Sequence, residues 1–189
     1  MFAGPNGAGK TTINSLIKSD LLGIYINPDL IEAEIKKFGF LDLKNYNVIA
    51  EEAEILDFFS NSALLEKADL TLAAEALSFN DAKLSFFAVD VNSYFASVAS
   101  DFIRQKLLFA RTSFTFETVM SSPDKVNFLA QAQKSGYRTY LYFIATNNPL
   151  INISRVKNRV TEGGHAVPKE KIVSRYYRSL YRFPLETMQ

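Results

Sequence analysis

The chain has 189 residues, of which 48% are hydrophobic and 22% are charged, and its formal net charge at pH 7 is +1. This composition predicts one globular domain over residues 1–189, and the near-neutral charge argues against a general nucleic-acid or membrane binder. The sequence has no cysteine, which excludes disulfide bonds and thiolate metal sites. It shows neither a signal peptide nor an apolar run near the roughly 18 residues of a membrane span, so we expect a cytoplasmic protein.

The first predicted element is a strand ending at Ala3, followed by the glycine-rich sequence GPNGAGKTT at residues 4–12. This sequence matches the phosphate-binding pattern G-x-x-x-x-G-K-[ST] at every fixed position. In such loops backbone N–H groups surround phosphate, the lysine contacts the β- and γ-phosphates, and the following hydroxyl binds Mg²⁺. We therefore predict that the chain binds ATP and Mg²⁺, with Thr11 as the metal ligand. The predicted nucleotide-contacting residues are Gly4, Asn6, Gly7, Ala8, Gly9, Lys10, Thr11 and Thr12.

The next elements predict the start of a βαβ unit. A helix is expected over residues 10–21, from the apolar spacing of Ile13, Leu16 and Ile17, and a buried strand over residues 24–26. A further helix is expected over residues 30–38. Residues 20–75 carry 12 acidic and 4 basic side chains, and we expect residues 40–110 to form a mainly helical insertion.

The second half alternates helices with strands. Apolar residues at helical spacing predict an amphipathic helix over residues 91–108. β-rich runs at 114–116 and 139–145 predict two central parallel strands, with a helix at 125–134 between them. Strands alternating with helices indicate an α/β fold, here a three-layer P-loop NTPase fold with a mostly parallel sheet.

Two carboxylates follow predicted strands at the edge where open α/β sheets bind ligands. Asp29 is placed to accept a proton from a substrate hydroxyl. Its spacing to Glu32 equally fits a helix-capping role, and the spacing alone leaves both roles open. Glu117 is placed to bind substrate hydroxyls or hold a water on Mg²⁺, or it is a solvated strand end.

Residues 150–182 are predicted to form an arginine-rich lid. The segment 151–189 carries 8 basic and 3 acidic side chains, which is suited to phosphates and equally to a solvated helix surface. Arg155 and Arg159 are expected to share one helix face with Asn152. The opposite stripe is formed by Ile153, Val156 and Val160.

After this helix, Gly163-Gly164-His165 is expected to be either a lid hinge or a helix-ending turn. The final helix carries a second basic stripe that we expect to be a solvated surface. That stripe consists of Arg175, Arg178 and Arg182, opposite Ile172, Tyr176 and Leu180.

Two motifs that the sequence lacks narrow the class of P-loop protein. The chain has no N-K-x-D sequence for reading guanine and no second signature of an ABC-type ATPase. A small-molecule kinase fits best, since such an enzyme needs a phosphate loop, a base near the acceptor hydroxyl and lid arginines.

The motifs together resemble the zeta-toxin-like ATPase family. The residues that carry the resemblance are 2–12, Asn27-Pro28-Asp29, Phe116-Glu117-Thr118, Arg155-Val156, Arg159-Val160, 163–168 and Arg175-Tyr176. The resemblance implies an ATP-dependent kinase with an adenylate-kinase-like sheet. The family's toxin members phosphorylate UDP-N-acetylglucosamine and are held inactive by a small antitoxin protein.

The resemblance also implies residue roles. Asp29 corresponds to the catalytic aspartate, Glu117 and Thr118 to sugar-nucleotide contacts, and Arg155 to a lid arginine that meets the phosphates. Asn27 is expected to join the substrate contacts. The role of the second lid arginine falls to His165, to Arg159 or to no residue.

The comparison with the family leaves two questions about this chain. Family members carry a longer first strand and a further strand after the arginine-rich helix, so we expect an incomplete sheet edge. Alternatives to a sugar-nucleotide kinase are a kinase with another acceptor and a nucleotide-gated binding module without kinase activity. In the binding module, ATP orders the lid, a partner protein recognises the ordered state, and Asp29 is only a cap.

Overall fold

The computed structural model describes residues 1–162 and 166–186, with side chains described through residue 181. The chain divides into two compact units. The first unit comprises residues 1–22 and 115–189, and the second unit comprises residues 23–114. The single domain expected from the sequence stays a prediction.

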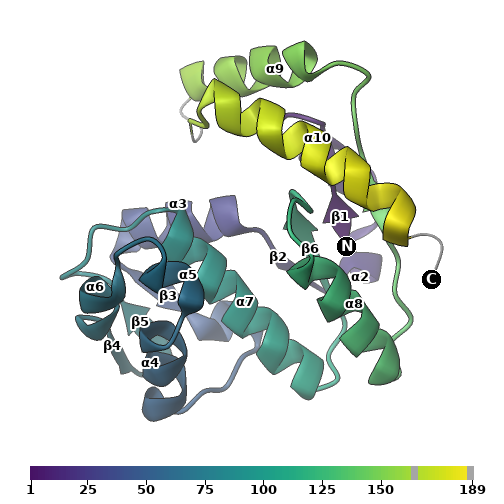
Figure 1. Ribbon diagram of the computed structural model, residues 1–189. Helices are drawn as coiled ribbons and strands as arrows, with labels where there is room; N and C mark the ends of the chain where they lie inside the picture. Colours follow the sequence, from purple (N-terminus) through teal and green to yellow (C-terminus); the bar gives the residue numbers. More distant parts are fainter. Residues whose placement is uncertain (163–165, 187–189) are drawn as a thin grey trace. The chain divides into compact units, whose positions relative to one another are not determined.

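The first unit contains three strands and five helices among its described residues (Figure 1). They are β1 (Phe2–Ala3), α1 (Lys10–Asn14), α2 (Ser19–Leu22), β6 (Phe114–Thr118, whose first residue belongs to the second unit), α8 (Asp124–Lys134), β7 (Tyr142–Phe143), α9 (Pro149–Thr161) and α10 (Lys169–Glu186).

Strand β1 lies between β6 and β7 and is parallel to both. Phe2 lies opposite Glu117 on one side and Tyr142 on the other, so the loop after Ala3 starts at the ends of three parallel strands. Within the first unit the strand order is β6-β1-β7. This parallel sheet with its helices is the predicted α/β fold of a P-loop NTPase.

Apolar side chains hold helix α8 on the sheet. Phe2 is 1% exposed and its ring stacks on Tyr142 at 5.3 Å. Phe128 of α8 meets Phe116 of β6 edge to face, with ring centroids 5.6 Å apart. Aromatic pairs of this geometry add to the free energy of simple burial.

Two predicted elements are shorter in the structure than in the sequence analysis. The helix expected over residues 10–21 is interrupted between α1 and α2. Asn14 and Ser15 at the break are weak helix formers, and the Ser15 hydroxyl donates to the Thr12 carbonyl oxygen at 2.8 Å. Leu16 is 76% exposed, so no core contact holds a continuous helix. The strand expected over 139–145 is limited to Tyr142–Phe143.

The second unit contains the remaining elements. They are β2 (Ile24–Ile26), α3 (Pro28–Phe38), β3 (Phe40–Asp42), a 3-10 helix (Leu43–Tyr46), α4 (Glu52–Ser60), α5 (Ala63–Glu66), α6 (Thr71–Glu75), β4 (Ser78–Asn80), β5 (Lys83–Ser85) and α7 (Ser93–Phe109).

Helix α7 is the centre of the second unit and packs against α3 (Figure 1). Its predicted apolar stripe is buried, with Phe95, Val98 and Phe102 all less than 5% exposed. Rings from other elements join this core, and Phe86 meets Phe95 edge to face at 5.9 Å.

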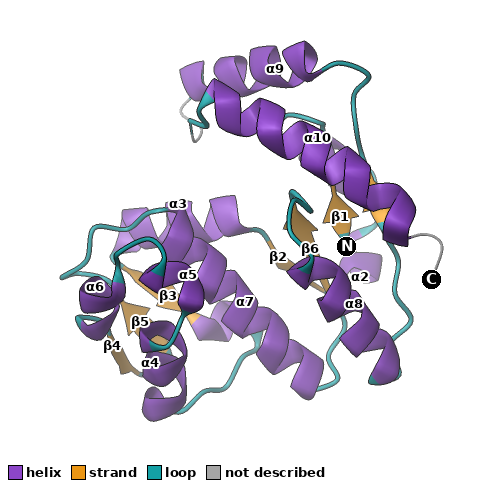
Figure 2. Cartoon of the chain, viewed as in Figure 1, coloured by secondary structure: helices purple, strands orange, loops and turns teal. Residues whose placement is uncertain are grey.

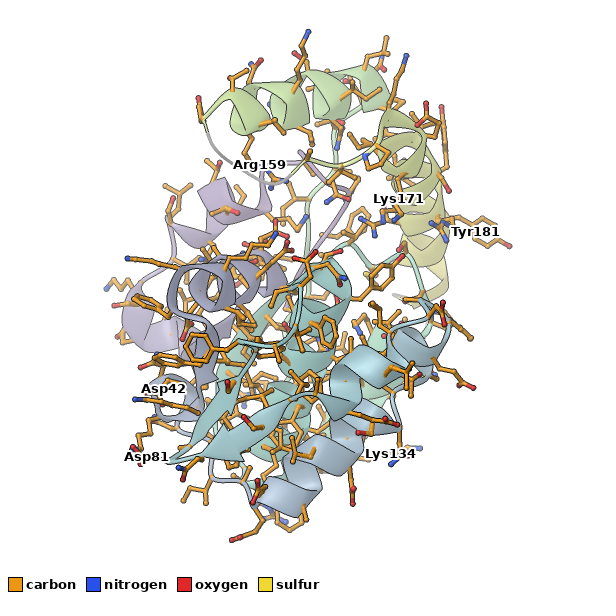
Figure 3. All side chains as sticks on the ribbon, turned by 90° about the vertical axis from the view of Figure 1, so that its left-hand side faces the viewer. Asp42, Asp81, Lys134, Arg159, Lys171 and Tyr181 are labelled. Atoms are coloured by element: carbon orange, nitrogen blue, oxygen red, sulfur yellow. The ribbon has the colours of Figure 1, made fainter. Side chains whose placement is uncertain are left out.

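Strands β3, β5 and β4 form an antiparallel sheet in that order, which the sequence analysis did not predict (Figure 2). Asp42 and Asp81 lie at the same end of this sheet (Figure 3). The Lys44 ammonium donates to the Asp81 carboxylate at 2.8 Å. This hydrogen bond lowers the pKa of Asp81 below its usual range.

Candidate active site

The candidate site is built around the loop that joins β1 to α1. The Gly4 N–H donates to the Thr118 carbonyl oxygen at 3.2 Å, and the Ala8 N–H donates to the Pro5 carbonyl oxygen at 3.1 Å. Gly7 has φ +76°, and a Cβ built on it lies 2.6 Å from the Asn152 carbonyl oxygen. The loop therefore needs a glycine where the backbone of α9 approaches it.

Lys10 folds back over this loop. Its ammonium donates to the Gly4 carbonyl oxygen at 2.8 Å and to the Pro5 carbonyl oxygen at 3.2 Å. These contacts place the positive charge at the mouth of the loop, where an anion held by the loop N–H groups would lie.

Thr11 and Glu117 supply neighbouring oxygen atoms. The Thr11 hydroxyl donates to the Glu117 carboxylate at 3.3 Å, and Glu117 is 7% exposed at the end of β6. Hydroxyl and carboxylate oxygens are donors that Mg²⁺ accepts, together with phosphate oxygens and water. The residues present therefore fit a magnesium ion. No group of three or more histidine, cysteine or acidic residues placed to hold a metal occurs among residues 1–162 and 166–186.

Helix α9 contributes Arg155 to the same loop. Its Nη1 donates to the carbonyl oxygens of Gly7 and Ala8 at 3.4 and 3.3 Å. A second cation therefore lies beside the loop that already holds the Lys10 ammonium. Arg159 lies one turn further along α9 and is half-buried (Figure 3).

The predicted faces of α9 are wrong for Asn152. Asn152 is fully buried, and Val156, predicted to lie on the opposite stripe, is buried too at 4% exposure. The Asn152 side chain is satisfied inside the protein. Its Nδ2 donates to the Asn6 carbonyl oxygen at 2.6 Å, and its Oδ1 accepts from the Thr146 hydroxyl. Because both ends are hydrogen-bonded, an amide is tolerated at a core position.

Helix α10 reaches the loop through Arg175, contrary to the expectation of a solvated stripe. Its Nη1 donates to the Asn6 side-chain oxygen at 3.3 Å. Arg178 is exposed as expected and donates to Ser174 of its own helix. Ile172 and Tyr176 are buried, as predicted. The side chain of Arg182 lies outside the described part of the chain.

The predicted acceptor-side residues belong to both units. In the second unit, the Asn27 side chain accepts from the Asp29 N–H at 2.9 Å and caps α3. The capping role considered for Asp29 is therefore wrong, because Asn27 holds it and Asp29 lies in the first turn. Glu32 pairs with Lys36 at 2.6 Å. The base role of Asp29 and the substrate role of Asn27 stay predictions.

Thr118 is a further predicted substrate residue and lies at the end of β6. The Thr118 hydroxyl accepts from the Met120 N–H at 3.1 Å. His165 lies outside the described residues, as do the two glycines of the expected hinge.

Comparison with known proteins decides the family. A family model described as zeta toxin matches residues 83–183, which is more than half of the chain. This chain belongs to the zeta toxin family. The match includes Glu117, all of α9, and α10 up to residue 183. It begins after the phosphate loop, so the assignment of the loop rests on its own motif and geometry.

A curated protein also resembles part of this chain. An uncharacterized protein of Haemophilus influenzae is 30% identical over 63 residues, which are 33% of this chain and 45% of that protein. The chain therefore spans less than half the length of this curated relative. No solved structure matches the chain. Across the described residues, no helix is long and apolar enough to cross a membrane.

Proposed function

We propose that this zeta toxin family member is an ATP-dependent phosphotransferase. It transfers the γ-phosphoryl group of ATP to a hydroxyl of a small molecule, and a UDP-amino sugar such as UDP-N-acetylglucosamine is the first candidate acceptor. The observation that carries the proposal is the gathering of Lys10, Arg155 and the Thr11–Glu117 pair around one phosphate-binding loop.

Each of these side chains has a role that phosphoryl transfer requires. The Lys10 ammonium exchanges the loop carbonyls for β- and γ-phosphate oxygens. Arg155 stabilises charge on the phosphoryl group during transfer, with Arg159 as its neighbour on the helix. Thr11 and Glu117 would hold Mg²⁺, directly or through water. Bound Mg²⁺ neutralises charge that develops on the phosphates.

The acceptor side of the proposal rests on the family resemblance. Asp29, in the first turn of α3, accepts the proton of the attacking hydroxyl. Asn27, Glu117, Thr118 and His165 are proposed to contact the sugar nucleotide. A cytoplasmic location and a small antitoxin partner belong to the same proposal.

The first experiment tests nucleotide binding. ATP with Mg²⁺ at about 100 times its Kd raises the free energy of unfolding by about 2.7 kcal/mol, since it binds only the folded protein. The thermal shift is expected to disappear in the Lys10→Ala, Thr11→Ala double variant. Lys18→Ala, which removes an exposed lysine outside the loop, is the control and keeps the shift. An equal shift in the double variant contradicts the nucleotide site.

The second experiment tests transfer. Mass spectrometry of mixtures with UDP-sugars is expected to show one added phosphate on the acceptor. Arg155→Ala is expected to lower the turnover rate far more than Arg178→Ala, with nucleotide affinity nearly unchanged. ATP binding without phosphate on any acceptor would favour the nucleotide-gated module instead.

A further inference from the structure

One residue of the phosphate loop is held by both C-terminal helices. The main-chain oxygen of Asn6 accepts from Asn152 of α9 at 2.6 Å, and its side-chain oxygen accepts from Arg175 of α10 at 3.3 Å. The two helices pack side by side within the first unit (Figure 1). Asn6 is therefore the residue where α9 and α10 both contact the loop.

Four hydrogen bonds and the backbone link between Arg175 and Tyr176 form a closed ring that includes Asn6. Asn152 accepts from the Thr146 hydroxyl, and the Thr146 carbonyl oxygen accepts from the Tyr176 hydroxyl at 2.7 Å. Tyr176 is 3% exposed and adjoins Arg175 in the sequence, which returns the ring to Asn6. Since Asn152 is fully buried, loss of one bond leaves a polar group without water, which is costly. The ring therefore ties α10 firmly to the loop.

Because the peptide bond is planar, anchoring the Asn6 carbonyl also sets the orientation of the Gly7 N–H. The Asn6 carbonyl and the Gly7 N–H belong to one planar peptide unit and point in opposite directions. A hydrogen bond that fixes the carbonyl therefore also aims the Gly7 N–H. Gly7 at φ +76° would otherwise be among the most freely rotating residues of the loop.

We propose that Asn152 and Arg175 are positioning residues that aim the Gly7 N–H at the phosphate chain of the nucleotide. The nucleotide part of this inference rests on the proposed function. Arg175 acts through Asn6, so its effect on affinity depends on that side chain. The arrangement pre-organises the loop, which raises affinity by removing the cost of ordering it on binding.

The test begins without nucleotide, so that it is independent of the proposed function. Hydrogen exchange of the amides in residues 6–8 is compared in the unaltered chain, Arg175→Gln and Arg178→Gln. We expect faster exchange at these amides in Arg175→Gln and no change in Arg178→Gln, which alters an exposed arginine of the same helix that donates to the Ser174 carbonyl oxygen. Arg175→Lys keeps a positive donor and is expected to restore part of the protection. Unchanged exchange in Arg175→Gln overturns the inference.

The second measurement is the Kd for ATP with Mg²⁺. Arg175→Gln and Asn6→Ala are each expected to weaken binding about tenfold, since each removes a hydrogen bond to a charged group. The double variant is expected to bind as each single variant does. Multiplied losses in the double variant would mean that Arg175 acts apart from Asn6 and would overturn the positioning role. If the unaltered chain binds no ATP, the proposed function fails, and the exchange result alone decides whether α10 positions the loop.

Discussion

Replacing Gly4 by alanine is the most direct test of how the loop joins the sheet. Gly4 follows β1 and has φ +142°, a region that side chains disfavour. A Cβ built there lies 1.9 Å from the Ile144 carbonyl oxygen, which belongs to the backbone just after β7. Backbone atoms cannot swing away as a flexible side chain can, so the strand ends must separate.

The expected cost has two parts. Strain at the Gly4 φ of +142°, outside the left-handed helical region, costs about 1–3 kcal/mol for alanine. Ordinary contact needs about 3.4 Å, so the Ile144 carbonyl must move by about 1.5 Å. That movement breaks or weakens the bond from the Ile144 N–H to the Ala3 oxygen at 2.8 Å. This bond is worth about 1 kcal/mol, so we expect a total loss of about 2–4 kcal/mol.

Gly136→Ala is the matched control. Gly136 has φ +87°, and a Cβ built there meets nothing within 4 Å, so only the strain of about 1–2 kcal/mol applies. Urea unfolding followed by circular dichroism gives both free energies of unfolding. An equal loss of stability in the two variants would refute the argument, because it would show that contact with Ile144 costs nothing.

Three further predictions follow from particular residues. Asp29→Asn is expected to keep ATP affinity and stability, because Asn27 caps α3, and to lower phosphoryl transfer by about 10²–10⁴-fold in a steady-state assay; unchanged transfer removes Asp29 from the mechanism. Phe95→Ala empties a fully buried position and is expected to cost about 3–5 kcal/mol in urea unfolding; a loss under 1 kcal/mol would contradict the packing of α7. Asp81 has a lowered pKa in the folded protein, so its contribution to stability is present above pH about 4 and is lost as pH falls through the folded pKa. Carboxylate titration by NMR should show this pKa returning toward its usual value in Lys44→Met, and an unchanged value would exclude the Lys44 contact as its cause.

The sequence predicted the elements whose signals are local and long. Helix α7 repeats its apolar residues over 17 residues, helix α9 begins at Pro149, and helix α10 begins directly after Pro168. The residues of the phosphate-loop motif are consecutive in the chain, so the motif can be recognised from the local sequence alone. Strands β3, β4 and β5 are three residues each, which is too short for an alternating pattern to stand out from its surroundings.

The sequence predicted the site residues that belong to a known motif. It did not predict the residues that reach the loop only through tertiary packing. Lys10 and Thr11 follow from the loop pattern. Asn152 and Arg175 contact Asn6 across 146 and 169 residues of chain, and no local pattern encodes that distance. The available sequence signal was the position of Asn152 four residues before Val156, which places both on one helix face. Both are buried in the structure, and a polar residue in an apolar stripe needs an internal hydrogen-bond partner.

The sequence distances between Asn6 and its partners also set the order in which the parts of the site are synthesised. The phosphate loop leaves the ribosome before Arg175, which follows 169 residues later than Asn6 and therefore about 8–34 s later at typical elongation rates of 5–20 residues per second. The second unit, residues 23–114, is complete well before α9 and α10 exist. During that interval the nascent loop lacks the bonds from Asn152, Arg155 and Arg175. A nucleotide site that depends on these bonds is complete only once α10 has been made.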